Sequence, residues 1–176
     1  LPVPLRVYQW RAEGLIELGR LPGLPGLPAE PYLVEPVAWP ADRDAWWALT
    51  DELVAHGVVG LALRDHPLGQ EDVEALARLL RLRYLDLAGA TLAPAALAEL
   101  ASARDLALLG LARTEVTDPD AAALVAQLPA LRVLDLRATG AGDRVVAAAA
   151  AVPGLTSLLL ADNAVTDAGG AALAAA

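Results

Sequence analysis

Few side chains in this sequence could carry out chemistry on their own. The chain has two histidines, two serines and no cysteine, which excludes disulfides, thiolate metal sites and cysteine nucleophiles. His56 falls where a helix should end and His66 falls in a turn, so a structural role is the simpler interpretation of both. Ser102 and Ser157 lie in no nucleophile motif, and no glycine-rich phosphate loop is present. We therefore predict that the chain is not an enzyme.

Carboxylates are the remaining candidates for chemistry. Asp86 and Asp135 occupy equivalent positions of repeated strands and should lie two strands apart, at about 9.6 Å. That separation overlaps the range of roughly 6.5–9.5 Å found in inverting glycosidases, but an open sheet face offers no pocket to raise the pKa of one carboxyl group. Asp118, Asp143 and Asp167 form a second column. A ladder of cation sites is one interpretation and helix capping is the simpler one, so we predict no metal and no cofactor.

A periodic pattern of leucines positions these side chains. Three apolar positions recur five times with the same internal spacing, and the first position of each set returns every 24 or 25 residues. This period predicts stacked repeats of one strand and one helical segment each. The sets begin at Val58, Leu82, Leu106, Leu131 and Leu155, in repeats 58–81, 82–105, 106–130, 131–154 and 155–176.

The helical half of a repeat begins with the phrase T-x-V-T-D and a small residue. In Thr117-Asp118-Pro119, Asp118 is the predicted cap and Pro119 fits the first turn, where its missing N–H costs nothing. Thr166-Asp167 should start the last helix in the same way. Gln70 and Pro94 stand at the Asp position in the first two repeats, which predicts different helix starts there.

This phrase resembles the bacterial leucine-rich repeat proteins related to the ribonuclease-inhibitor-like class, over residues 58–176. The resemblance implies an α/β fold, a right-handed solenoid with a parallel sheet on its concave face and short helices on its convex face. Members of the family generally bind proteins along the concave sheet, so the resemblance also implies a protein partner. It is specific for the fold and leaves the partner unidentified.

The residues before the repeats are rich in proline. We predict that residues 1–33 form an N-terminal segment or linker, in which Leu5–Trp10 and Leu15–Leu18 could pair as a hairpin. Prolines then recur at every third position, which fits a polyproline II segment. A stiff connector is the simpler interpretation, and a ligand for an aromatic groove is the other. These prolines are Pro22, Pro25, Pro28 and Pro31.

Residues 34–57 read as a degenerate N-terminal capping repeat. Stepping back one period aligns Val34, Val37 and Trp39 with the three apolar positions of the next repeat. The helix that follows should span about Arg43–His56, with Asp42 or Asp44 at its start and Gly57 after its end. Bulky tryptophans in this repeat would cover the open end of the core. They are Trp39, Trp46 and Trp47, and a ligand site is their alternative role.

The other end of the solenoid shows no such unit. Leu155–Ala176 lacks a polar capping repeat, and its helix contains Gly169-Gly170 and few large apolar residues. We therefore expect that the chain is a piece of a longer protein with further repeats, or that this last repeat frays.

Net charge and hydropathy limit the class of partner. The formal net charge of −9 disfavours nucleic acid and anionic membrane surfaces. The longest apolar run, Val145–Val152, is far shorter than the roughly 20 residues that span a bilayer. Cysteine usage leaves the compartment undetermined, and a cytoplasmic bacterial setting is favoured.

Alternation along each strand predicts which side chains the concave face exposes. In Val133–Arg137, Leu134 and Leu136 should point inward and the other three residues outward. The same phase makes Tyr84, Leu108 and Val133 an exposed apolar stripe across adjacent strands, with a mixed charged rim around it. The rim consists of Asp86, Asp135, Arg113 and Arg137.

These seven residues are the predicted partner-binding site. Tyrosine and arginine are common among residues that dominate binding energy. The alternative is that the seven residues only face solvent, with Asp135 and Arg137 paired locally for little energy. We predict a protein–protein interaction module. A passive or self-associating scaffold and the recognition arm of an enzyme encoded elsewhere in a longer chain are the alternatives.

Overall fold

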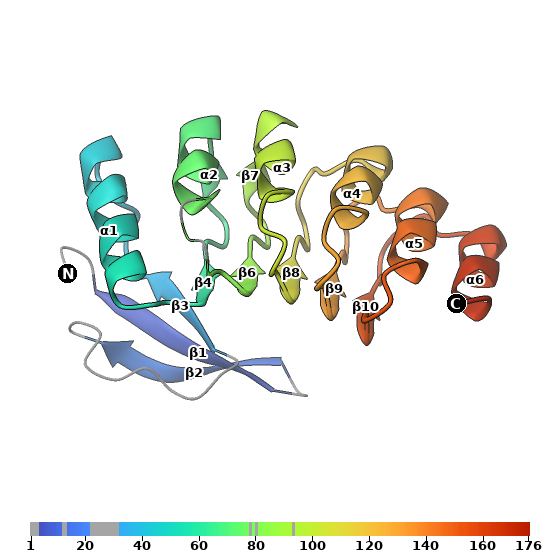
Figure 1. Ribbon diagram of the computed structural model, residues 1–176, viewed down its shortest axis with the longest axis horizontal. Helices are drawn as coiled ribbons and strands as arrows, with labels where there is room; N and C mark the ends of the chain where they lie inside the picture. Colours follow the sequence, from blue (N-terminus) through green and yellow to red (C-terminus); the bar gives the residue numbers. More distant parts are fainter. Residues whose placement is uncertain (1–3, 12–13, 22–31, 78, 80, 93) are drawn as a thin grey trace.

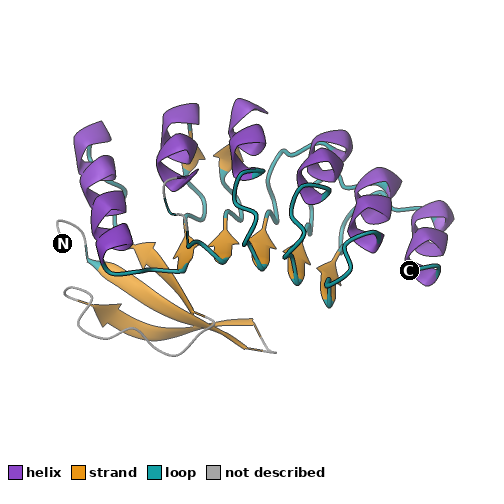
Figure 2. Cartoon of the chain, in the orientation of Figure 1, coloured by secondary structure: helices purple, strands orange, loops and turns teal. Residues whose placement is uncertain are grey.

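The computed structural model describes residues 4–11, 14–21, 32–77, 79, 81–92 and 94–176, and shows the strands of the main sheet along one side and the helices along the other (Figures 1 and 2). The main sheet contains β1 (Leu5–Arg11), β2 (Gly14–Leu21), β3 (Tyr32–Pro36), β4 (Gly60–Ala62), β6 (Tyr84–Asp86), β8 (Leu108–Gly110), β9 (Val133–Asp135) and β10 (Ser157–Leu159), and a small second sheet pairs β5 (Pro67–Leu68) with β7 (Thr91–Leu92). The helices are α1 (Arg43–Ala55), α2 (Gln70–Ala77), α3 (Pro94–Leu100), α4 (Asp118–Val125), α5 (Asp143–Ala150) and α6 (Asp167–Ala174).

The middle leucine of each repeat fixes the register of the sheet. From β4 to β10 the strands run parallel, and this leucine pairs with its counterpart on each neighbouring strand. The helices spread over a wider arc than the strands in Figure 1, so the sheet lines the concave face. This arrangement confirms the predicted α/β solenoid. The interior column is Leu61, Leu85, Leu109, Leu134 and Leu158, and its first four members are fully buried.

The strand of the first unit, β3, differs from its predicted register. Val34, rather than Val37, lies beside Leu61, because β3 begins earlier than one 24-residue period would place it. The first unit is longer than the others since α1 has 13 residues, whereas α2, α4, α5 and α6 have 8 each. The alignment of Val37 and Trp39 with the second and third apolar positions was therefore wrong.

A hairpin extends the sheet beyond the first repeat. β1 pairs antiparallel with both β2 and β3, and its side chains Leu5 and Val7 are buried in the same core as the repeats. The predicted hairpin is thus present, and the described residues before β3 belong to the sheet rather than to a linker. Pairing of β1 with β3 and burial of Leu5 and Val7 in the core explain why they do. The four prolines spaced by three lie outside the described residues.

Side chains cap the ends of α1 and α4 differently. Asp42, one of the two predicted candidates, caps α1 by accepting a hydrogen bond from the Ala45 amide at 2.9 Å, and Gly57 follows the helix with a φ of +63°. In α4 the cap is Thr117, and Asp118 is the first helical residue instead of the predicted cap. Asp118 is displaced from that role because its carboxylate turns toward the next repeat.

The aspartates at this position cap the helix of the following repeat. Asp118 accepts hydrogen bonds from the Gly142 amide at 2.8 Å and the Val145 amide at 3.0 Å, and α5 has no capping side chain of its own. Asp143 likewise accepts from the amides of Thr166 and Gly169 at the start of α6. Backbone N–H groups thus occupy both carboxylates, which argues for capping rather than for a cation ladder.

The last repeat is packed on one side only. Leu158 and Leu160 are half-buried, although their counterparts in the preceding repeat are fully buried, and Leu173 of α6 is 41% exposed. β10 is an edge strand of the main sheet. Among the described residues, no helix has both the length and the apolar content needed to cross a membrane.

Candidate binding surface

The three residues of the predicted apolar stripe align across neighbouring strands of the sheet. Tyr84, Leu108 and Val133 are direct partners on β6, β8 and β9. Leu108 is only 3% exposed, so its prediction as an exposed residue was wrong. Strands in a sheet lie about 4.8 Å apart, so Tyr84 on one side and Val133 on the other flank the Leu108 side chain closely. Tyr84 and Val133 are half-buried and supply most of the accessible apolar surface of the row.

Two predicted rim carboxylates lie in the next row and are buried. Asp86 and Asp135 are each 6% exposed, with Gly110 between them in the sheet register. The Asp86 carboxyl group leans over Gly110, where a Cβ atom would meet it. The small central residue therefore leaves the space that the Asp86 side chain fills, and the expectation of an exposed acidic rim was wrong at both positions.

Asp135 is paired locally. Arg137 donates to it from Nε at 2.9 and 3.2 Å, from Nη2 at 2.7 Å and from its backbone N–H at 3.1 Å. A bidentate arginine–carboxylate pair has fixed geometry, and this one satisfies the buried charge. Arg137 itself remains half-exposed at the edge of the row.

Glu35 of β3 completes the carboxylate row, although it was absent from the predicted site. It is 8% exposed and accepts hydrogen bonds from the Tyr8 hydroxyl at 2.7 Å and from Arg64 Nε at 3.0 Å. The Arg64 guanidinium also lies 4.6 Å from the centre of the Tyr8 ring, which fits a cation–π contact. Burial, followed by the hydrogen bond to Glu35, raises the pKa of Tyr8. The N-terminal hairpin therefore contributes directly to this surface.

A signal for Glu35 exists in the sequence. Leu33-Val34-Glu35 repeats the order of two apolar residues and an acid found in Tyr84-Leu85-Asp86 and Val133-Leu134-Asp135. Pairing of Val34 with Leu61 places Glu35 in that acidic row. A strict 24-residue period hid this match because the first unit is longer.

Asp86 has the weakest compensation for its charge among the three carboxylates. Its Oδ1 accepts one hydrogen bond from the Ala88 amide at 3.1 Å, and its Oδ2 lies 3.9 Å from Arg64 Nε. Burial raises the pKa of Asp86, and the nearby charges of Asp135 and Glu35 raise it further against the opposing effects of Ala88 and Arg64. The surroundings of Asp86 thus favour its neutral form.

Arg113 lies apart from this constellation. Its Nη2 is 3.4 Å from Asp65 Oδ1, and both side chains are more than half exposed. The pair crosses Gly89, where a Cβ atom would collide with the Asp65 carboxylate. Arg113 therefore sits on the ridge of turns beside the sheet, and the structure brings together the other six predicted residues.

Comparisons with known proteins agree with this architecture. Residues 155–174 match the family model described as a leucine rich repeat. No curated protein matches the sequence. The crystal structure of an internalin (inlF) from Listeria monocytogenes is similar, with a TM-score of 0.55 and 16% sequence identity over 75% of this chain. The match covers 42% of that structure, so this chain spans less than half of its length.

The fold is therefore a leucine-rich repeat solenoid, the class to which the repeat period, the parallel sheet and the structural match all point. Leucine-rich repeat proteins generally mediate protein–protein interactions.

Proposed function

We propose that this chain is a protein-binding module that holds another protein against its concave sheet and performs no catalysis. The supporting observation is the continuous row of Tyr84, Leu108 and Val133 across three paired strands. We further infer that the chain belongs to the bacterial, ribonuclease-inhibitor-like class of these repeats, on the strength of the phrase ending in Thr117-Asp118. Nucleic acid, membranes and small-molecule cofactors are not the expected partners.

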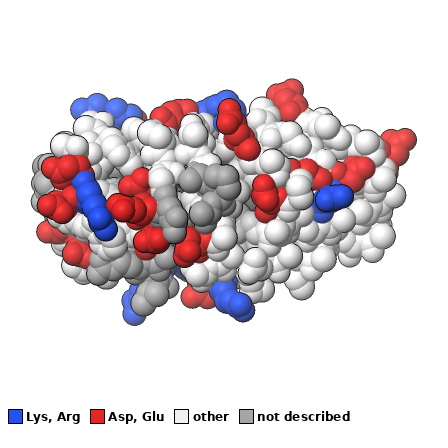
Figure 3. All heavy atoms as spheres, turned by 90° about the horizontal axis from the view of Figure 1, so that it is seen from above, with Lys and Arg blue, Asp and Glu red and all other residues white. Residues whose placement is uncertain are grey.

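The charged groups beside the row favour a rigid binding surface. Asp135 and Glu35 are already paired with Arg137 and Arg64, so a partner that covers them meets no unpaired charge at these two positions. Leaving a buried charge without a partner would cost several kcal/mol. The aromatic ring of Tyr84 supplies contact area at a small cost in side-chain entropy. On the opposite, helix side, charged groups are scattered over the surface (Figure 3).

The test disrupts the row without disturbing the core. The double variant Tyr84→Ala and Val133→Asp changes two half-buried side chains, whereas Leu108→Asp would bury a charge and threaten folding. The immobilised wild-type chain should capture a defined protein from a lysate of its source organism, and the double variant should lose at least about tenfold in affinity for it, or about 1.4 kcal/mol.

The matched control places the same charge on the helix side. Ala147→Asp changes an exposed residue of α5 and should retain the captured protein. Thermal melting should show that all three chains are folded. Loss of the partner in the control but not in the double variant would show that the partner binds the helix side, and it would overturn the proposal.

Self-association is a second candidate function, favoured by a cavity beside the last repeat of this chain. A cavity of about 320 Å³ there is lined by Leu155, Leu158 and Leu173, and the edge of β10 has no strand beside it in the described sheet. Sedimentation of the wild-type chain and of Leu173→Asp distinguishes this role. A dimer that dissociates in the variant supports it, and a wild-type monomer at high concentration removes it.

A further inference from the structure

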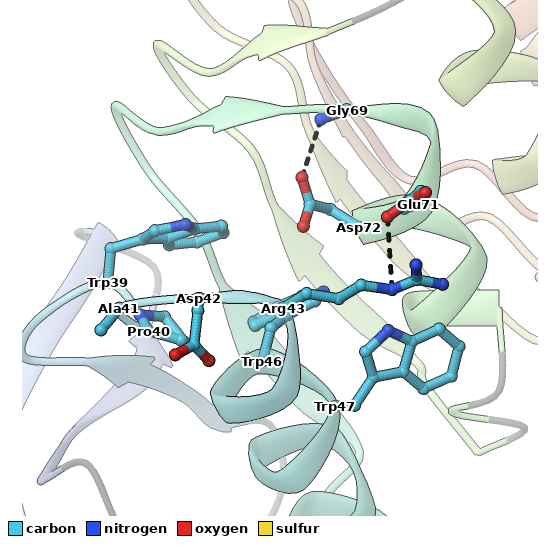
Figure 4. Close-up of a pocket in the computed structure, with 10 residues that line it drawn as sticks. All are labelled: Trp39, Pro40, Ala41, Asp42, Arg43, Trp46, Trp47, Gly69, Glu71 and Asp72. Atoms are coloured by element: carbon cyan, nitrogen blue, oxygen red, sulfur yellow. Dashed lines mark hydrogen bonds and ion pairs between the residues drawn. The ribbon is translucent and has the colours of Figure 1, made fainter.

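A tryptophan-lined cavity lies at the opposite end of the solenoid from the last repeat. It measures about 470 Å³ and opens between the segment that leads into α1 and the first turn of α2 (Figure 4). Ligand cavities commonly measure about 300–1,000 Å³. Three of the four tryptophans of the chain line it, namely Trp39, Trp46 and Trp47. The sequence favoured end-cap packing for them, and the cavity adds a second role.

The rings of this cavity are held in place by packing. Trp39 stacks on Trp46 with ring centres 5.0 Å apart and also lies 4.5 Å from the His66 ring. Trp46 is 2% exposed and belongs to the core. Its indole Nε1 is buried and has no hydrogen-bond partner among the described residues. Packing therefore holds the tryptophan rings of the cavity wall in place before any ligand binds.

Carboxylates outnumber cations around the opening. Asp42, Glu71 and Asp72 line the cavity together with one arginine, Arg43. Asp42 and Asp72 each accept one backbone hydrogen bond, from Ala45 at 2.9 Å and from Gly69 at 2.8 Å. Figure 4 shows the Arg43 side chain extended between Glu71 and Trp47. The cavity therefore carries net negative charge beside aromatic surface.

The contacts of Arg43 indicate which kind of ligand this cavity can bind. Its guanidinium lies 6.0 Å from the centre of a Trp47 ring and 3.3 Å from the Glu71 carboxylate. A cation over an indole face, held by a carboxylate, is a favourable arrangement. Both members of the ion pair are 63% exposed, and exposed pairs contribute little stability. A ligand can therefore displace Arg43 at small cost.

We propose that this cavity binds an organic cation, a guanidinium or alkylammonium group on an apolar stem, in the place now held by the Arg43 guanidinium. The stem lies along the tryptophan rings, and Glu71 and Asp72 balance the charge. An anion would meet three carboxylates, and an uncharged ligand would cover them without neutralising them. The site is separate from the concave sheet and does not depend on the function proposed for that face.

The test is a titration of the intact chain, monitored by tryptophan fluorescence. The three tryptophans of the cavity contribute to this signal. The probe is Nα-acetylarginine methylamide, and the matched control is Nα-acetylcitrulline methylamide, which has nearly the same shape without the charge. We expect a saturable change in emission with the arginine probe and none with the citrulline probe. n-Butylguanidine and n-butyltrimethylammonium then distinguish recognition by hydrogen bonds from recognition by charge alone.

Two variants make the result specific to the cavity. Arg43→Ala removes the internal competitor and should tighten binding of the arginine probe about two- to fivefold, and Glu71→Gln in that background should reverse the gain. Arg144→Ala, an exposed arginine at the start of α5, is the matched control and should change nothing. Circular dichroism checks that each variant is folded. Equal responses to both amide probes, or unchanged affinity in Arg43→Ala, would overturn the proposal.

Discussion

At the scale of single residues, Asp86 is the buried carboxylate of the concave face whose charge is least compensated by its neighbours. It is buried in a row that also holds Asp135 and Glu35, each two strands away, and its Oδ2 lies 3.9 Å from Arg64 Nε. Its pKa is raised above the ordinary value of 3.8 because burial disfavours the ionised form. A carboxyl group with a raised pKa in the folded state stabilises the fold when protonated and loses that contribution as pH rises through the folded pKa.

We therefore predict that Asp86→Asn stabilises the chain at neutral pH. Asparagine keeps an acceptor for the Ala88 amide and removes the buried charge. The gain over wild type should be largest above the folded pKa of Asp86 and should shrink as pH falls toward 3.8. Urea unfolding of both chains across this window measures it, with the exposed Asp105→Asn as a control for losing one carboxylate. A gain that grows on acidification would contradict the assignment.

At the scale of elements, carboxylates join α4 to α5 and α5 to α6. α5 begins at a glycine cap with no side chain, and Asp118 of the preceding repeat supplies the missing acceptor. Gly142 and Gly169 leave room for this contact, since a Cβ atom at either position would lie close to the aspartate of the preceding repeat. These two glycines thus have a packing reason.

Removal of this link should loosen the neighbouring helix rather than the helix that carries it. We predict that Asp118→Ala destabilises the chain by about 0.5–2 kcal/mol, the usual cost of a lost helix cap, and speeds hydrogen exchange at the Val145 amide. Thr117→Ala is the matched comparison, because Thr117 accepts from the Asp120 amide within α4. Faster exchange at Asp120 alone in Asp118→Ala would show that the cap acts within its own repeat.

The Asp143 link adds a pH dependence to the last helix. The hydroxyl and the amide of Thr166 donate to its carboxylate, which lowers the pKa of Asp143. A lowered pKa means that this contribution to stability is present above the unfolded value of 3.8 and is lost as pH falls through the folded pKa. The docking of α6 therefore weakens in acid, in the opposite sense to the effect of Asp86.

The features that the repeat period determines could be predicted from the sequence. The features that depend on side chains of neighbouring strands and repeats could not. Leu61 through Leu158 form the expected column because alternation assigns one face of each short strand to the core. Burial of Leu108 and Asp86 depends on the size of the residues on adjacent strands, and the role of Asp118 depends on a glycine in the next repeat. Glu35 was missed because the long α1 shifted its register.

At the scale of the whole molecule, the core is covered to different extents at the first and the last repeat. The hairpin covers the first repeat and adds Leu5 and Val7 to the core. At the other end, β10 lies at the edge of the sheet, and its side chains are all half-buried. In a solenoid each repeat is stabilised by its neighbours, so the last repeat of this chain has one stabilising interface where the others have two.

This asymmetry predicts how the cost of one substitution varies along the molecule. The third leucine of each repeat is fully buried at Leu63, Leu111 and Leu136 but only half-buried at Leu160. Replacement by alanine should cost about 2–5 kcal/mol at a fully buried position and distinctly less at Leu160. Leu63→Ala is the comparison, because the unit with β3 and α1 on one side and the next repeat on the other should keep its cost as high as that of Leu136→Ala. Equal costs at Leu160 and Leu136, measured by urea unfolding and by hydrogen exchange in residues 155–174, would mean that the last repeat is as tightly held as the middle of the stack.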